Sequence, residues 1–343
     1  MTRATVPAMD RIAVIGAGSW GTTVAALAAR STDTVLWARR PELAAAINRT
    51  RTNPDYLDGF DLPDRLVATS DLESAVNGID VLVMAVPSHG FRDVFAALAG
   101  GIADTVPILS LTKGIEQDSL ATMTEVVAEV APAHDPSVTG VLTGPNLAAE
   151  IVAGQPTASV IAMGDGDTAR RLQTVFMGPS FRVYTNDDVV GCELGGALKN
   201  VMAIASGMSD GLGFGDNTRA TLLTRALAEL TRLGVALGGR PETFAGLAGM
   251  GDLIATASSS KSRNYRVGYA LAEGKSLDQI VSEMRMVAEG VKTTKSVLGL
   301  AARSKVEMPI ASHVGLVLDG VIDPKDAVLS LMTREAKAES HER

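Results

Sequence analysis

The chain has 343 residues, 46% of them apolar and 20% charged, a balance that excludes a disordered protein. Its 39 acidic and 31 basic residues give a net charge of −8, which leaves no overall attraction to nucleic acid or to an anionic membrane. The single cysteine, Cys192, excludes an intrachain disulfide and a cysteine-based zinc site, and the four histidines lack metal-ligand spacing.

No targeting or membrane-spanning segment is predicted. The first ten residues contain no apolar block of the kind found in a secretory signal. The longest strongly apolar runs, such as residues 81–86, fall short of the roughly 20 residues that cross a bilayer. At roughly 150 residues per domain, the length favours two domains. We expect a soluble, cytoplasmic, two-domain protein with a disordered N-terminal extension over residues 1–10.

The first half of the chain alternates short apolar runs with helix-length amphipathic stretches. Strands are predicted over residues 12–15, 34–38, 81–86, 107–111, 138–143, 158–163 and 182–184. Helices are predicted over residues 20–29, 41–48, 91–99, 119–130 and 167–176. Runs rich in Val, Ile and Leu are typical of strands that helices cover on both faces. The pattern predicts an α/β domain over residues 11–186 with a doubly wound, mostly parallel sheet.

Only helical patterns remain in the second half. Helices are predicted over residues 189–209, 218–237, 262–273, 277–284, 291–304 and 310–318. We place the domain boundary at residues 186–187 and predict an all-helical domain over residues 187–335, with a tail over residues 336–343. Since no long linker separates the halves, we expect them to pack closely and to bind a ligand between them.

The first predicted strand runs directly into a turn that contains Gly16, Gly18 and Gly21 in Gly-x-Gly-x-x-Gly spacing. In such a turn the first glycine permits the bend, the second lets the backbone approach a pyrophosphate, and the third allows a helix to pack on the strand. The helix N-terminus then attracts the phosphates. A glycine motif alone also occurs in structural turns, but the flanking strand and helix favour a dinucleotide cofactor in a Rossmann-like domain.

Two arginines stand where the cofactor's ribose is expected. In this kind of domain an acidic residue about 20 residues after the glycines binds the ribose hydroxyls. Arg39 and Arg40 occupy that place, at the end of the second predicted strand. Because arginine binds phosphate through a forked pair of N–H groups, we expect NADP to be accepted beside NAD. The alternative is that both arginines are solvated loop charges.

Lys199 is the candidate acid–base group. Hydride transfer to or from a secondary alcohol needs a group that exchanges the hydroxyl proton, usually histidine or a lysine of lowered pKa. Lys199 stands beside Leu198, Val201 and Met202 in a largely apolar helix, so burial would lower its pKa. The alternative is a lysine that reaches solvent from the helix surface. His89 also lies near the expected cofactor edge, but is better explained as a polar loop residue.

Other polar residues follow strands or open a helix. Lys113 follows the fourth predicted strand, and Gly144 and Asn146 follow the fifth, where ligands bind in doubly wound sheets. Residues 258–264 combine hydroxyls, an amide, a lysine and an arginine at a predicted helix start, which favours a small phosphate-bearing substrate. The alternatives are plain turns and a disordered polar loop. The glycine-rich residues 211–215 follow a helix and are predicted to form an inter-helix turn.

With these residues assembled, the sequence closely resembles the bacterial NAD(P)-dependent glycerol-3-phosphate dehydrogenases, from residue 16 to residue 309. The motifs that carry the resemblance are Leu198-Lys199-Asn200, residues 207–215 with Asn217, residues 248–253, Ser262-Arg263-Asn264 and residues 287–290. This ordered series discriminates better than the glycine turn does.

The resemblance implies an oxidoreductase that interconverts dihydroxyacetone phosphate and sn-glycerol 3-phosphate with NAD or NADP and without a metal. It implies that Lys199 exchanges the substrate's hydroxyl proton. The implied substrate contacts are Lys113, Gly144, Asn146, Lys199, Asp252, Ser262, Arg263 and Asn264. The implied dinucleotide contacts are Gly16, Gly18, Ser19, Trp20, Gly21, Arg39, Arg40, Lys113, Ala148, Arg263, Val287 and Glu289.

The chain departs from the family at one implied contact. The family's Ser-Gly-Pro-Ser or Ser-Gly-Pro-Thr is here Thr143-Gly144-Pro145-Asn146. An amide still hydrogen-bonds to a substrate oxygen, but it is longer than a hydroxyl. The resemblance also implies a cytoplasmic homodimer that supplies glycerol 3-phosphate for phospholipid synthesis.

Two other functions fit part of the pattern. One is a two-domain dehydrogenase that acts on a hydroxyacyl-CoA or a sugar acid. The other is a catalytically silent dinucleotide sensor, which would keep the glycine turn but would not need Lys199, Asp252 and residues 258–264 together.

Overall fold

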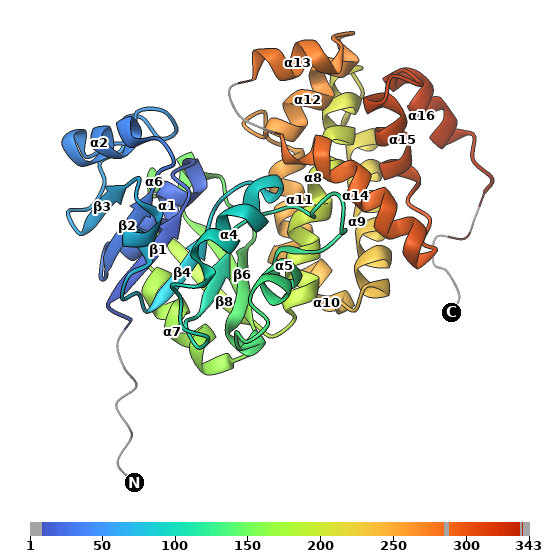
Figure 1. Cartoon of the computed structure of the whole chain (residues 1–343). Coiled ribbons are helices and arrows are strands. Elements are labelled where there is room, and N and C mark those ends of the chain that lie inside the picture. Colours follow the sequence, from blue (N-terminus) through green and yellow to red (C-terminus); the bar gives the residue numbers. More distant parts are fainter. Residues whose placement is uncertain (1–8, 285–287, 337, 339–343) are drawn as a thin grey trace.

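One sheet of eight strands organises the first half of the chain in the computed structural model, which describes residues 9–284, 288–336 and 338 (Figure 1). The strands are β1 (Arg11–Ile15), β2 (Asp33–Trp37), β3 (Leu66–Thr69), β4 (Val81–Met84), β5 (Ile108–Ser110), β6 (Thr139–Thr143), β7 (Thr157–Met163) and β8 (Phe181–Asn186). Their order is β3-β2-β1-β4-β5-β6-β7-β8, and neighbours run parallel except β6 and β7. The predicted doubly wound, mostly parallel sheet is confirmed.

Helices cover both faces of this sheet. One face packs against α1 (Ser19–Ala28), α2 (Pro41–Thr50), α6 (Ala148–Val152) and α7 (Gly166–Phe176). The other packs against α3 (Leu72–Val76), α4 (Phe91–Ala99) and α5 (Met123–Val130). Ile12 and Val14 belong to the first core, and Ala13 and Ile15 to the second, because successive side chains of a strand point to opposite faces. Burial on both faces explains the near-continuous apolar runs. Two short turns, η1 (Ser88–Gly90) and η2 (Pro136–Val138), connect these elements.

The described residues after Asn186 form helices and no strand, as predicted. They are α8 (Val189–Gly211), α9 (Asp216–Ala236), α10 (Pro241–Ala245), the π-helical turn η3 (Leu247–Gly251), α11 (Asp252–Ala257), α12 (Arg263–Ala272), α13 (Leu277–Glu283), α14 (Glu289–Ser304), α15 (Pro309–Leu318) and α16 (Pro324–Met332). They gather beside the sheet, with α8 among them as the central helix (Figure 1). The glycine-rich residues 211–215 form the predicted turn between α8 and α9.

Helix α8 is the core of the helical half and also joins the two halves. It contacts α9, α11, α12, α14 and α15. By length and composition α8 is apolar enough to cross a membrane, but 83% of its most apolar window is buried inside the protein. Near its first turn, Cys192 packs with Val141, Val160 and Ala162 of the sheet. The helix that carries Lys199 is therefore anchored on the sheet itself.

Three local expectations need correction. The helix predicted over residues 119–130 begins at Met123, because Leu120 has a left-handed backbone and Thr122 caps the helix. Strand β3 was not predicted; it is a short edge strand in which Val67 is 54% exposed, so its apolar signal is weak. Met9, within the expected N-terminal extension, is buried in the first core. Residues 1–8 of the expected extension, and residues 337 and 339–343 of the expected tail, lie outside the described residues.

Candidate active site

The glycine turn has the geometry that its spacing predicts. Gly16 has φ of +122°, and a Cβ there would lie 2.5 Å from the carbonyl oxygen of Ala85. A Cβ on Gly21 would overlap the carbonyl oxygen of Gly16, so α1 packs directly on the turn. In contrast, nothing lies within 4 Å of a Cβ on Gly18, the N-cap that precedes Ser19 at the start of α1. Gly18, Ser19 and Trp20 are partly exposed at the start of α1, which fits a pyrophosphate bound over this helix N-terminus.

Four further residues of the first half are predicted dinucleotide contacts, and they lie on α1, just after β2 and on α6. Trp20 lies in the first turn of α1, and its indole Nε1 is buried without a hydrogen-bond partner among the described residues. Arg39 and Arg40 come just after β2, and both are exposed. Arg40 already binds the Asp55 carboxylate, whereas Arg39 has no ion pair among the described residues. Ala148 opens α6.

Two lysines from different halves meet one buried carboxylate. Asp252 opens α11 directly after the π-helical turn η3 and is 1% exposed. Its Oδ2 lies 2.5 Å from Lys113 Nζ, and its Oδ1 lies 3.0 Å from Lys199 Nζ. Lys199 Nζ also donates to Thr256 Oγ1 at 2.6 Å, and Thr256 Oγ1 donates to Asp252 at 3.1 Å. The first half thus contributes one cation, and the second half the other cation and the anion.

Burial sets the protonation of this cluster. Lys199 is 5% exposed, and its burial lowers its pKa to about 8; Asp252 opposes this shift, while Lys113 and Arg263 add to it. Burial by itself raises the pKa of Asp252, but the two ammonium groups more than compensate and hold it below its usual value. A pKa of about 8 leaves Lys199 mostly protonated at neutral pH, beside an ionised Asp252. The sequence interpretation of Lys199 as buried is confirmed.

Lys113 is held at both ends. Its Nζ donates to the carbonyl oxygen of Gly144 at 2.9 Å, and its own carbonyl oxygen accepts from Asn200 Nδ2 at 3.1 Å. Gly144 has φ of +127°, which a residue with a side chain rarely adopts. The structure therefore brings Lys113 and Gly144 together, as the positions of both residues after parallel strands suggested.

Asn146 contributes a buried amide donor to the site. Its Oδ1 accepts a short hydrogen bond from Ser159 Oγ, which fixes the orientation of the amide. Its Nδ2 is buried and has no partner among the described residues, and the same holds for the Oγ1 of Thr143. Buried N–H groups are nearly always hydrogen-bonded in native structures. The unpaired amide of Asn146 is therefore suited to donate to a ligand oxygen.

The polar residues 258–264 lead into α12, as predicted. Ser262 is the N-cap, and its Oγ accepts from an amide of the first helical turn at 3.3 Å. Arg263 follows as the first, exposed residue of the helix. The Asn264 amide is paired within the protein: its Nδ2 donates to Asn200 Oδ1 and its Oδ1 accepts from Gly290 N, each at 2.9 Å. Both ends of this amide therefore link α8, α12 and α14, and its contact with substrate stays a prediction.

The start of α14 closes another side of the site. Glu289 is its first residue, and its carboxylate accepts from Ser88 Oγ across the two halves at 2.8 Å. Ser88, Lys292 and the exposed His89 line a cleft of about 420 Å³ beside this contact. Val287, the remaining predicted dinucleotide contact, lies outside the described residues.

Models of one protein family match most of the chain. The NAD-dependent glycerol-3-phosphate dehydrogenase N-terminus matches residues 11–169, and the corresponding C-terminus matches residues 188–329. The chain belongs to the NAD-dependent glycerol-3-phosphate dehydrogenase family. It is 54% identical to glycerol-3-phosphate dehydrogenase (NAD(P)+) 2 of Sphingopyxis alaskensis, over 96% of this chain and 98% of that protein. It is 52% identical to the glycerol-3-phosphate dehydrogenase (NAD(P)+) of Geobacter sulfurreducens, over 96% and 99%.

Solved structures agree with this membership. The glycerol-3-phosphate dehydrogenase of Coxiella burnetii superposes with a TM-score of 0.90 at 37% identity, covering 96% of this chain and 100% of that one. A ketopantoate reductase of Ralstonia eutropha superposes with a TM-score of 0.58 at 17% identity, covering 93% and 99%, and shares the fold alone. The chain is therefore an NAD(P)-dependent oxidoreductase. Within its described residues, no three His, Cys, Asp or Glu side chains gather to hold a metal ion.

Several polar residues of this dehydrogenase site were not singled out from sequence. Thr256 follows Asp252 by one helical turn and so shares its face, a signal that was available. Asn200 lies in the same motif as Lys199 but was not assigned a contact. Ser159 and Ser88 carry no local signal, because their partners come from other segments of the chain.

Proposed function

We propose that Lys199 gives and takes the proton while this enzyme interconverts dihydroxyacetone phosphate and sn-glycerol 3-phosphate. The observation that carries the proposal is the buried Lys199 ammonium, held 3.0 Å from Asp252 and 2.6 Å from Thr256 Oγ1. A group with a pKa of about 8 is mostly protonated at neutral pH yet releases its proton readily. Both directions of the reaction need that property.

The first half would hold the dinucleotide at the glycine turn, with its pyrophosphate over Gly18 and the first amides of α1. When bound, the nicotinamide supplies or accepts a hydride at the central carbon of the substrate. Trp20 and Glu289 add a donor and an acceptor, the first from α1 and the second from the start of α14. The cofactor would therefore bridge the two halves.

The substrate's phosphate and its reacting oxygen both need partners in the site. Lys113 and Arg263 bring positive charge from the two halves, which orients a dianionic phosphate and stabilises a developing alkoxide. Asn146 Nδ2 offers a buried donor to a substrate oxygen. Asp252 orients the Lys199 ammonium, so that the third N–H of Lys199 is available to the substrate's oxygen.

Arg39 and Arg40 are our candidates for the choice between NAD and NADP. The Asp55 carboxylate already neutralises Arg40, so Arg39 is the stronger candidate for the additional phosphate of NADP. Steady-state kinetics with NADH and NADPH test this. Arg39→Ala should raise the KM for NADPH by about tenfold, the worth of one charge-assisted hydrogen bond, with little change for NADH. An equal change in KM for NADH and NADPH would mean that Arg39 does not bind the additional phosphate of NADP.

The test of the proton role compares two lysines. Lys199→Ala should lower kcat for dihydroxyacetone phosphate reduction by about 10²-fold or more, the usual contribution of a positioned acid–base group. Lys275→Ala removes an exposed lysine paired with Glu283, and should leave kcat unchanged. An unaltered kcat in Lys199→Ala would remove Lys199 from the chemistry. Failure of the wild-type enzyme to reduce this substrate, with turnover of a hydroxyacyl-CoA or a sugar acid instead, would favour the rival dehydrogenase.

The domain boundary, the oligomeric state and the cellular role are also part of the proposal. We place the domain boundary at residues 186–187; the family models, which end at residue 169 and resume at residue 188, support it. We also propose a cytoplasmic homodimer, joined through the helical half, that supplies glycerol 3-phosphate for phospholipid synthesis. Exposed apolar side chains at Val321, Leu329 and Met332 support an interface there. Sedimentation of the wild type and of Leu329→Asp tests it: a monomer in both would refute the dimer.

A further inference from the structure

The chain between β5 and α5 leaves the sheet and lies along α14. We call residues 113–121 the connecting loop. Four positions on α14, spaced four, three and four residues apart, face it and so share one side of the helix. Their contacts are Lys292 O with Gln117 Nε2 at 3.5 Å, Ser296 Oγ with Glu116 O at 3.4 Å, Gly299 with the Leu120 side chain, and Arg303 across a cavity of about 290 Å³ from Ser119 and Leu120.

Leu120 has an unfavourable backbone conformation. Its φ is +60°, in the left-handed region that leucine rarely adopts. The other described residues with a side chain and positive φ, Arg51 and Lys305, are the C-caps of α2 and α14, where this conformation ends a helix. Leu120 ends no helix. Tertiary contacts must therefore hold it there, and such residues cluster at functional sites.

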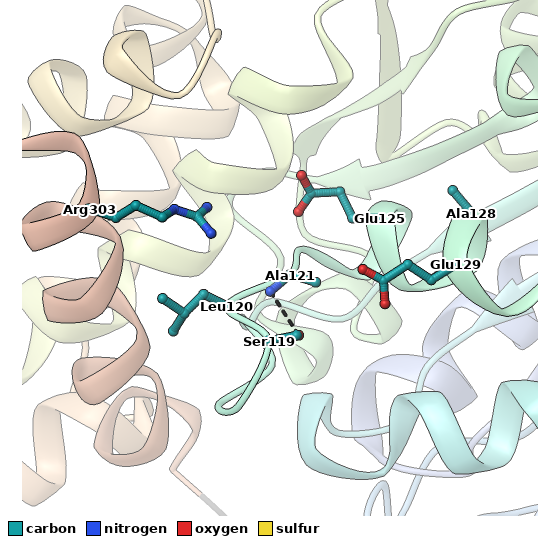
Figure 2. Close-up of a pocket in the computed structure, with 7 residues that line it drawn as sticks. All are labelled: Ser119, Leu120, Ala121, Glu125, Ala128, Glu129 and Arg303. Atoms are coloured by element: carbon teal, nitrogen blue, oxygen red, sulfur yellow. Dashed lines mark hydrogen bonds between the residues drawn. The ribbon is translucent and has the colours of Figure 1, made fainter.

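The contact that holds Leu120 is made with a glycine inside a helix. The Leu120 side chain packs on the core of the helical half, although it belongs to the first half of the chain. A Cβ on Gly299 would lie 3.0 and 3.2 Å from its two terminal methyl groups. Figure 2 shows Leu120 directed to the side from which Arg303 comes, away from Glu125 and Glu129 of α5. Two locally unfavourable choices, a left-handed leucine and a mid-helix glycine, thus produce one contact.

The same loop begins with a residue of the active site. Lys113 reaches Asp252 and Gly144, and two residues later Ile115 is buried in the helical core. Glu116 N donates to the carbonyl oxygen of Ala121 at 2.9 Å, and Arg92 binds the Glu116 carboxylate through two N–H groups. Residues 116–121 are therefore closed into one turn, and only Gly114 and Ile115 separate this turn from Lys113.

We propose that Leu120 and Gly299 are positioning residues for the reaction. Their contact sets the depth at which the connecting loop enters the helical half, and hence the place where Lys113 meets Asp252 and Lys199. This inference rests on the proposed function, because it takes Lys113 and Lys199 as working groups. Neither Leu120 nor Gly299 touches the substrate.

Gly299→Ala tests the proposal because it separates activity from stability. The added methyl group forces Leu120 to yield by a few tenths of an ångström, which should lower kcat for dihydroxyacetone phosphate reduction by about tenfold. Alanine is the better helix former, so the denaturation midpoint should not fall in proportion. Leu120→Ala should also lower kcat, and the double variant should lose less than the two single losses multiplied. The control Lys305→Gly replaces a left-handed residue at the end of the same helix, and should keep kcat.

The pH profile of kcat/KM supplies a readout that a structural role would not move. If Lys113 moves away from Lys199 in Gly299→Ala, its repulsion of the Lys199 ammonium weakens and the pKa of Lys199 rises. The pH midpoint of the kcat/KM profile should rise with it. Unchanged kcat and midpoint in both single variants would overturn the inference. So would activity that falls only in step with the folded fraction. A wild type without turnover would refute the proposed function instead, and a crystal structure of Gly299→Ala would then show whether Lys113 had moved.

Discussion

Asp252→Asn removes the carboxylate that lies between the Lys113 and Lys199 ammonium groups, while it keeps the size of the side chain. Asp252 raises the pKa of Lys199 from 3.0 Å away, against the burial that lowers it. An opposite charge this close typically shifts a pKa by about one to three units. Without Asp252, the pKa of Lys199 should therefore fall from about 8 to about 6. At pH 7 the protonated fraction of Lys199 then drops from about 0.9 to about 0.1.

The assay is the pH dependence of kcat/KM for dihydroxyacetone phosphate reduction, followed by nicotinamide absorbance. Reduction needs the ammonium form, so the rate is full below the pKa of Lys199 and falls as the pH rises through it. The falling limb should move to lower pH by about two units in the variant. The second ionisation of the substrate's phosphate, near pH 6, is common to both enzymes and cancels in the comparison.

A second buried carboxylate provides the matched control. Glu193 on the same helix as Lys199 accepts from the amide and hydroxyl of Thr124 at 3.0 and 2.5 Å, away from the lysine pair. Glu193→Gln should leave the midpoint in place, whatever it does to stability. A midpoint in Asp252→Asn that stays put or rises would refute the assignment of the limb to Lys199, and with it the proton role.

Three further predictions use other parts of the structure. Gly21→Ala should lower the free energy of unfolding by about 1–3 kcal/mol, because its Cβ would overlap Gly16. Gly18→Ala has room for its methyl group, so it should change the free energy of unfolding by less than about 0.5 kcal/mol. The same variant should raise the Kd for NADPH about tenfold. Urea denaturation and a fluorescence titration check both variants, and equal losses of stability in the two would contradict this difference. Burial raises the pKa of Glu229 to about 7 despite the α15 amides that bind it, so its contribution to stability is present at low pH and is lost as the pH rises toward 7. Between roughly pH 4.5 and 7, Glu229→Gln should lose about 1–3 kcal/mol less unfolding free energy than the wild type, as measured by urea unfolding. Parallel pH dependences of the two proteins would disprove this. Lys261→Ala breaks an ion pair whose lysine is 60% exposed, and should cost less than about 1 kcal/mol by thermal or urea unfolding. A larger loss would mean that this pair holds the two halves together.

Local pattern was sufficient for the elements that position the site. The strand and helix around the glycine turn followed from apolar spacing, because the same few residues both bend the chain and approach the ligand. The burial of Lys199 followed from its apolar neighbours on a helix that turned out to be the core of the helical half. Its acidic partner did not, since Asp252 lies on another helix and the second lysine comes from the other half.

The amino-acid sequence by itself determined the alternation of strands and helices, the dinucleotide turn and the place where the helical half begins, since these depend on residues a few positions apart. Only the tertiary structure decided that Asn264 joins three helices, that Leu120 interrupts a predicted helix, and that Lys199 has a pKa of about 8. The physical reason is that hydrogen bonding and charge balance depend on distances of a few ångströms between groups that the chain keeps far apart.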